Sequence, residues 1–167
     1  MIDFDSFLKE YRENLANIFK KEHETNTDAL DRGICQESLS TILSSKPLAA
    51  FIEHEHGGFG GHTGEALSML EASSYESLPL SLMMGINGAL FLQPLANYGS
   101  EDAKKEVFDR VITQGKMGGL MITEPDYGSE ALKMQTSVQF NSNEQHYAVK
   151  GTKHWAGLTG MADYWIM

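Results

Sequence analysis

The spacing of apolar residues changes near Gly115, and this change constrains the fold more than any other feature of the 167-residue sequence. Before Gly115, apolar residues recur every three or four positions, as they do on one face of an α-helix. After it, residues 136–140 and 146–150 alternate around an Asn-Ser-Asn-Glu turn, which is typical of a β-hairpin. The sequence therefore predicts a mostly helical α+β fold, with a helical bundle over 1–116 and the beginning of an antiparallel β-barrel or sandwich domain over 117–167.

Several regions before Gly115 have the spacing of amphipathic helices. They are expected at about 4–21, 39–43, 47–52, 63–73, 79–98 and 101–114. Ser100 has the position of an N-cap for the last of them, and Gly115 that of a C-terminal cap. The region that begins at Pro79 is almost entirely apolar, so we expect it at the centre of the bundle.

The sequence ends in a segment, 162–167, that is typical of the opening of another β-strand. A sheet that ends on a partly formed strand has unpaired edges. We therefore expect the chain to be part of a longer protein or to require a partner.

Charge and composition exclude some classes of function. The net charge of −10 argues against nucleic acid and anionic membranes as main partners, because both require clustered Lys and Arg. Cys35 is the only cysteine, which fits a reducing compartment, and no signal-peptide pattern is visible, so we expect a cytoplasmic protein. The longest apolar stretch, 78–96, is interrupted by Ser81, Asn87 and Gln93 and is interpreted as a buried helix, not a membrane span.

The segment 118–130 is the strongest indication of a binding site. An apolar run, expected to be a strand, turns abruptly into Thr123-Glu124-Pro125 and then Gly128-Ser129. Pro and Gly here indicate a turn, which presents backbone N–H groups and hydroxyls. Such groups suit a planar hydrogen-bonding cofactor or an anionic group.

This turn and the residues downstream resemble the acyl-CoA dehydrogenase family of flavoproteins. The most specific features, in chain order, are Thr123-Glu124-Pro125, Gly128-Ser129, Thr136, Gly151-x-Lys153-x-Trp155 and Ala162-Asp163. The segments Glu55-His56-Gly57-Gly58 and 98–104 resemble two further features of the family. The resemblance extends from about Glu53 to Met167.

The resemblance implies an enzyme that uses FAD. Members of the family oxidise the α,β bond of an acyl-CoA thioester to the enoyl-CoA and transfer a hydride to flavin N5. Their catalytic base is a glutamate in a C-terminal helical domain that has no counterpart in this chain. The catalytic residue is therefore unassigned, Glu124 is not given that role, and we expect the polypeptide alone to be inactive.

The resemblance also implies roles for particular residues. The expected cofactor-binding residues are Leu120, Ile122, Thr123, Ser129, Trp155, Ala156 and Gly157. Thr123 would donate a hydrogen bond to the flavin pyrimidine edge, Ser129 would bind the pyrophosphate or the CoA part of the substrate, and Trp155 would pack near the flavin ring. The alternatives are a strand-end threonine, a turn serine that bonds its own backbone and a core tryptophan.

Partners and rival functions follow from the same resemblance. The family implies an acyl-CoA substrate, a homo-oligomer (dimer or tetramer) and an electron-transferring flavoprotein as acceptor. Gly157 stands where the family usually has a threonine that bonds N5, so an oxygen-using acyl-CoA oxidase is an alternative. A non-catalytic helical binding or assembly module of the same fold is another.

The segment His54-Glu55-His56 with His62 has residue types that can bind a metal, because alternating ligands on an extended segment can share a face. The spacing matches no established site, so the segment is interpreted as a solvated loop, and no metal is expected.

Overall fold

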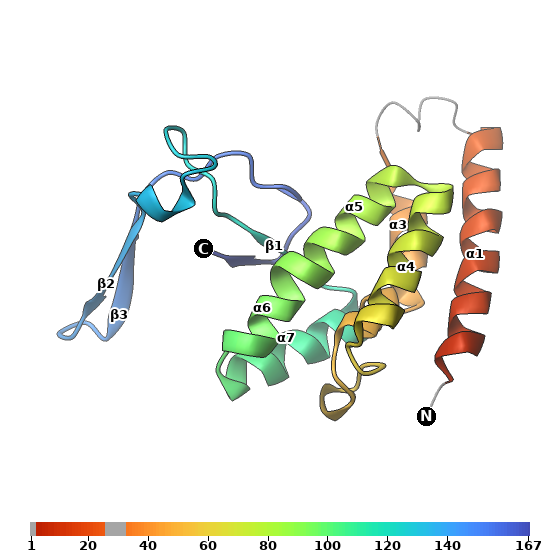
Figure 1. The fold of residues 1–167 in the computed structure, drawn as a ribbon, viewed down its shortest axis with the longest axis horizontal. Helices are drawn as coiled ribbons and strands as arrows, with labels where there is room; N and C mark the ends of the chain where they lie inside the picture. The colour runs from red at the N-terminus through yellow and green to blue at the C-terminus, as the bar shows by residue number, and fades with distance from the viewer. Residues whose placement is uncertain (1–2, 26–32) are drawn as a thin grey trace.

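The computed structural model describes residues 3–25 and 33–167, in which helices come first and strands follow (Figure 1). The expected mostly helical α+β fold is confirmed. The helical part contains α1 (Phe4–Thr25), α3 (Gln36–Ser44), the 3₁₀-helices η1 (Pro47–Phe51) and η2 (His54–His56), α4 (Thr63–Glu76), α5 (Leu78–Gly85), the π-helix η3 (Ile86–Leu92), α6 (Gln93–Tyr98) and α7 (Glu101–Gln114). After it come β1 (Gly118–Leu120), the 3₁₀-helix η4 (Ala131–Lys133), β2 (Ser137–Asn141), β3 (His146–Lys150) and β4 (Tyr164–Ile166).

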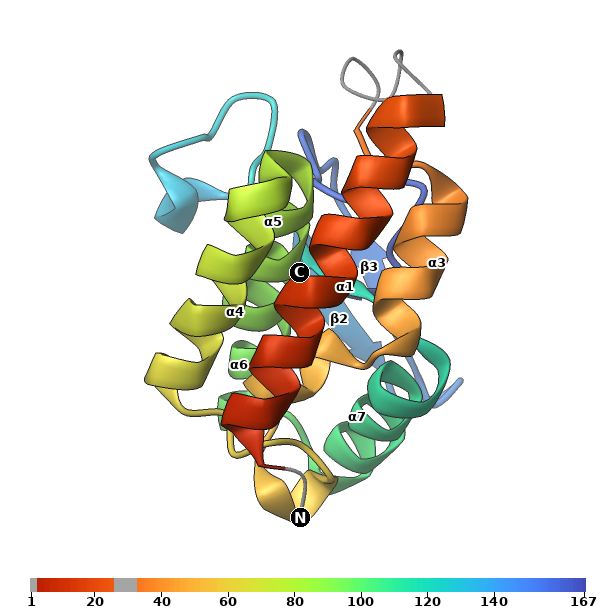
Figure 2. The ribbon, with the colours of Figure 1, turned by 90° about the vertical axis from the view of Figure 1, so that its right-hand side faces the viewer.

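The helical core is built from residues of α1, α3, α4, α5, η3 and α7. Figure 2 shows α1 lying against α3 and α4. Its largest fully buried side chains include Tyr11, Leu15, Leu39, Ile42, Met69, Leu80, Met84, Leu92 and Phe108. The Ser73 hydroxyl donates to the Met69 carbonyl at 2.7 Å, so the Tyr11 hydroxyl, 3.0 Å from Ser73 Oγ, is the donor in that pair. Burial raises the pKa of Tyr11 to about 12.

The two cap residues predicted for the last helix are confirmed. Ser100 Oγ accepts a hydrogen bond from the Ala103 amide at 3.3 Å, and Gly115 closes α7 with φ 64°. The helix expected at 47–52 is a short 3₁₀-helix instead. The Ala49 carbonyl accepts from the amide of Ile52, three residues on, at 3.2 Å and from the amide of Phe59 in the glycine-rich loop at 2.9 Å, and not from the amide of Glu53 as in an α-helix.

The apolar region 78–98 forms one continuous helical path through α5, η3 and α6. The expectation that it lies at the centre of the bundle is wrong for one of its faces, because Leu78, Leu82 and Leu90 are exposed. The path widens to a π-helix just before Pro94, whose ring would clash with the carbonyl four residues back in an α-helix. The sequence pattern did not predict this widening.

The same path, Leu78–Tyr98, is the only helix in the described part of the chain that is long and apolar enough to cross a membrane. In its most apolar stretch of 18 residues, 39% is buried inside the protein. Core helices of soluble proteins share this length and composition, and Leu80, Met84 and Leu92 of this path lie in the core.

Asn87 joins the helical part to the first strand. It lies in η3 and is 1% exposed. Its Nδ2 donates to the Met83 carbonyl at 2.9 Å, and its Oδ1 accepts from the Gly118 amide at 2.8 Å. Strand β1 can approach this closely because a Cβ on Gly118 would lie 2.2 Å from the Phe91 ring. The polar residue that interrupts the apolar run therefore positions β1.

The strands of the described residues form separate pairs. Strands β2 and β3 make the expected antiparallel hairpin, which extends away from the helices in Figure 1. One face of it carries exposed apolar side chains that face each other across the strands, namely Val138 opposite Val149 and Phe140 opposite Tyr147. Strands β1 and β4 pair in parallel. The long connection between them permits this arrangement, since parallel strands cannot be joined by a short turn.

We predict that Asn87→Ala lowers the free energy of unfolding by about 1–3 kcal/mol, because the buried Gly118 amide loses its partner. Urea denaturation followed by circular dichroism would measure the change. The control is Asn97→Ala on exposed α6, where we expect a change within about 0.5 kcal/mol. Equal losses in the two variants would show that Asn87 does not hold β1.

Candidate functional site

The segment that follows β1 lies beside the loop that follows β3. The His154 amide donates to the Thr123 carbonyl at 2.8 Å. The Gly157 carbonyl lies 3.3 Å from the position that a Cβ on Gly119 would occupy. Two sequence regions about thirty residues apart, which together hold most of the expected cofactor-binding residues, are therefore adjacent in the fold.

The Glu124 carboxylate fixes this arrangement. It is 5% exposed, and it accepts hydrogen bonds from the amides of Gln135 at 2.6 Å and Thr136 at 2.9 Å. Lys153 Nζ donates to the same carboxylate at 3.1 Å and to the Ile122 carbonyl at 3.2 Å. One buried side chain thus ties together the turn after β1, the start of the hairpin and the loop after it.

These contacts favour the ionised form of Glu124. The side chain of Thr136, the amide of Gln135, the amide of Thr136 and Lys153 together lower the pKa of the carboxyl from 4.5 to about 2, against the opposing effect of burial. The Thr136 hydroxyl itself makes no hydrogen bond of standard geometry within the described residues. The amides of Gln135 and Thr136 and the Lys153 ammonium are therefore the groups that hold the Glu124 carboxylate.

A second carboxylate, Asp163, joins β4 to the entrance of β1. Its oxygens accept from Lys116 Nζ at 2.8 Å and from the Met117 amide at 3.1 Å. Its own amide donates to the Met117 carbonyl at 2.8 Å. Burial acts to raise the pKa of Asp163, but the hydrogen bonds from Lys116 and Met117 outweigh it and lower the pKa.

Several donors at this place remain available to a ligand. Within the described residues, the Thr123 hydroxyl and the backbone N–H groups of Trp155, Ala156 and Gly157 make no hydrogen bond. The Trp155 side chain is 82% exposed, and its ring lies 4.8 Å from that of His154. The interpretation of Trp155 as a core residue is therefore wrong. An exposed indole beside open donors can bind a planar group that carries hydrogen-bond acceptors.

The expected site residues differ in their surroundings. Leu120 and Ile122 lie on the segment that leads to Thr123, with Ile122 exposed and Leu120 half-buried. Ser129 is exposed in the loop beyond Glu124, and in the described part of the chain its hydroxyl makes no hydrogen bond, so the alternative of a bond to its own backbone is not found. The sequence did not indicate that Asn87 and Asp163 position β1. It also did not indicate that Glu124 and Lys153 form an ion pair.

We predict that the stabilisation contributed by Glu124 is lost as the pH falls from about 4.5 to about 2, because the folded pKa is lower than the unfolded one. Urea denaturation of wild type and Glu124→Gln across this range would measure it, and the two unfolding free energies should converge at the acid end. Glu130→Gln, which removes an exposed pair with Lys133, is the control and should cost less at neutral pH. If the difference in unfolding free energy between wild type and Glu124→Gln does not change with pH, the charge of Glu124 does not stabilise the fold.

Comparisons with known proteins place the chain in a family. Residues 7–116 match the family model of the acyl-CoA dehydrogenase N-terminal domain, and residues 119–167 match that of the acyl-CoA dehydrogenase middle domain. A very long-chain specific acyl-CoA dehydrogenase of Rattus norvegicus is 25% identical over 160 residues, which cover 94% of this chain and 24% of the relative.

Solved structures share the fold. Butyryl-CoA dehydrogenase from Megasphaera elsdenii has a TM-score of 0.79 at 24% identity, covering 98% of this chain and 43% of that one. An acyl-CoA dehydrogenase complexed with FAD from Bacillus anthracis has a TM-score of 0.78 at 23% identity, covering 98% and 28%. The chain thus spans less than half the length of these proteins. From the matches to both of its domain models, the chain belongs to the acyl-CoA dehydrogenase family.

Proposed function

We propose that this chain forms one wall of the FAD site of an acyl-CoA dehydrogenase, which oxidises an acyl-CoA thioester to the enoyl-CoA. The observation that carries the proposal is the group of open donors at Thr123 and at 155–157, next to the exposed indole of Trp155. The FAD complex of the Bacillus anthracis relative supports the choice of cofactor. When bound, FAD supplies the redox chemistry by accepting the hydride from the substrate.

The residues of the chain would hold and shield this cofactor. The segment from Leu120 to Thr123 would run along the pyrimidine edge of the flavin, where the Thr123 hydroxyl would donate a hydrogen bond. The amides of Ala156 and Gly157 are the available donors for the N5 side, because Gly157 has no hydroxyl. Trp155 would exclude water from the ring, and Ser129 would bind the pyrophosphate or the CoA part of the substrate.

The chain's most prominent carboxylate is unsuited to proton abstraction. Glu124 is held by two amides and Lys153, and a pKa of about 2 makes it a weak base. We therefore assign the α-proton abstraction to a residue outside this chain, and we expect no turnover by this polypeptide alone.

The helical unit would cover 1–116 and the first part of the β domain 117–167. The complete enzyme would be a cytoplasmic dimer or tetramer that passes electrons to an electron-transferring flavoprotein. Because Gly157 lacks the hydroxyl that would bond N5, oxygen is the alternative electron acceptor. The rate at which the reduced flavin reacts with oxygen would distinguish an oxidase from a dehydrogenase that uses an electron-transferring flavoprotein.

We predict that the purified chain binds FAD and that Thr123→Val weakens the binding about tenfold, or about 1.4 kcal/mol, because one hydrogen bond is lost. Titration of FAD fluorescence with the protein would measure both affinities. Thr152→Val is the matched control, since Thr152 is an exposed threonine of the loop after β3, and we expect it to bind FAD as wild type does.

Two results would separate this proposal from its rivals. Absence of FAD binding by the folded wild-type chain would favour a non-catalytic helical module. Binding that is equally weakened by Thr123→Val and Thr152→Val would remove Thr123 from the site while leaving the cofactor in place.

A further inference from the structure

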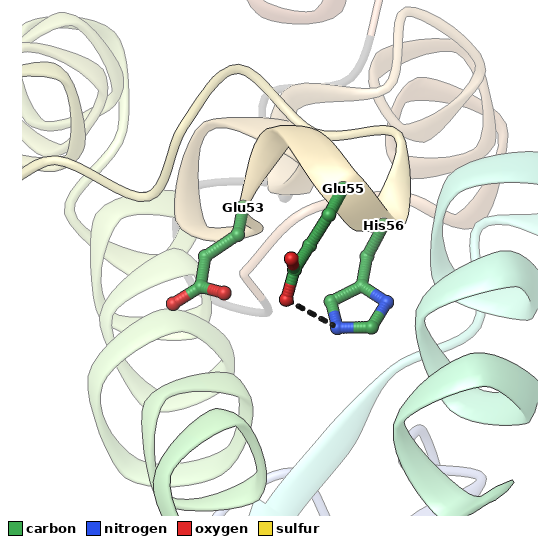
Figure 3. Close-up of side chains that lie close together, drawn as sticks. All are labelled: Glu53, Glu55 and His56. Carbon is green, nitrogen blue, oxygen red and sulfur yellow. Dashed lines mark ion pairs between the residues drawn. The ribbon is translucent and has the colours of Figure 1, made fainter. Parts of the chain in front are cut away.

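The glycine-rich segment between η1 and α4 carries a cluster of metal-ligating side chains that is separate in sequence from the loop at Trp155. Glu53, Glu55 and His56 each place one ligand atom so that all three atoms lie within 4.8 Å of one another. Figure 3 shows the three side chains leaving the same side of the η2 turn. His56 Nε2 and Glu55 Oε1 are 3.6 Å apart.

The 3₁₀ geometry of η2 creates this cluster. With three residues per turn, residues three apart lie above one another, which brings Glu53 and His56 to the same side. The extended segment considered from the sequence, in which His54 and His56 would share a face, is not formed. His54 instead lies with its Nδ1 3.1 Å from the Gly58 carbonyl, and its ring centre is 6.4 Å from that of His62.

The turn holds the cluster in place through its backbone. The Glu53 carbonyl accepts from the amides of His56 at 3.1 Å and Gly58 at 3.0 Å. The His56 ring packs against Phe108 of α7 with ring centres 4.9 Å apart, so its side chain is only 15% exposed. The imidazole is therefore held in one orientation and would lose little freedom on binding, whereas the exposed Glu53 and Glu55 side chains would have to be ordered.

The donor set indicates which ion fits. Two carboxylates and one imidazole nitrogen are ligands that suit Zn²⁺, whereas Ca²⁺ and Mg²⁺ prefer oxygen ligands alone. Tetrahedral zinc with ligands at about 2.1 Å requires ligand atoms roughly 3.4 Å apart, close to the separation of Glu55 and His56. A divalent cation would offset the like charges of the Glu53 and Glu55 carboxylates.

We infer that Glu53, Glu55 and His56 form a binding site for Zn²⁺ or a similar borderline divalent metal, with water completing the coordination. The site would fasten the η2 turn beside the start of α7. It is independent of the proposed FAD site, because it uses none of the same residues.

Zinc competition against a chromophoric chelator, on chain purified without an affinity tag, tests this inference. We expect one equivalent of Zn²⁺ to bind wild type, and His56→Gln and Glu53→Gln each to weaken the binding at least about tenfold. Glu53→Gln is the safer variant for folding, because Glu53 is exposed and its side chain makes no hydrogen bond within the described residues. Circular dichroism would check the fold of both.

A second histidine–glutamate pair provides the control. His146 Nδ1 lies 3.4 Å from Glu144 Oε2 on the exposed hairpin, outside the cluster. His146→Gln should bind zinc as wild type does. The inference is overturned if wild type binds no zinc, if Glu53→Gln and His56→Gln bind as tightly as wild type, if His146→Gln or His54→Gln is the variant that loses the metal, or if Ca²⁺ competes equally with Zn²⁺.

Discussion

The buried carboxylate of Glu124 is the interaction on which the β part of this chain depends. The short strand pairs there bury little apolar surface, and the hairpin is exposed on both faces. Three segments distant in sequence meet because one side chain accepts from two amides and from Lys153. Removing a partner from a buried, hydrogen-bonded charge leaves the remaining groups unsatisfied, which costs more than the intact pair contributes. The loops beside β1 therefore have a defined conformation without a large core beneath them.

The helical part meets this region through polar contacts as well. Asn87 supplies the acceptor for the first amide of β1, and Asp163 supplies contacts at both the start of β1 and the end of the loop before β4. The partner strand of β1 does not provide a hydrogen-bond acceptor for every backbone N–H group at its start. Side chains of neighbouring segments therefore accept from the amides of Met117 and Gly118. The position of the candidate site relative to the helices is thus set by the buried Asn87 and the exposed Asp163, together with Leu158, Tyr164 and Ile166, which pack against the helical core.

Local features of the fold could be predicted from the sequence, and features that depend on distant contacts could not. Ser100 and Gly115 mark helix ends through bonds within a few residues, and the hairpin follows from its turn and its alternation. The parallel pairing of β1 with β4, the exposure of Leu82 and the π-helix before Pro94 depend on what packs against each segment. For the site, the motif residues indicated a binding loop, but the joining of Glu124 to Lys153 requires knowledge of how the two loops meet.

The loop after β3 combines strain with support in a way that fits a binding site. Trp155 and Leu158 have φ of 53° and 68°, a left-handed conformation that costs roughly 1–2 kcal/mol for each such residue. Lys153 anchors the loop on one side, and on the other the Thr159 hydroxyl donates to the Ala156 carbonyl at 2.6 Å. In this conformation the indole is exposed beside amides that make no hydrogen bond within the described residues. Because the donors are already fixed, a ligand that accepts from them would lose little of its binding free energy to ordering the loop.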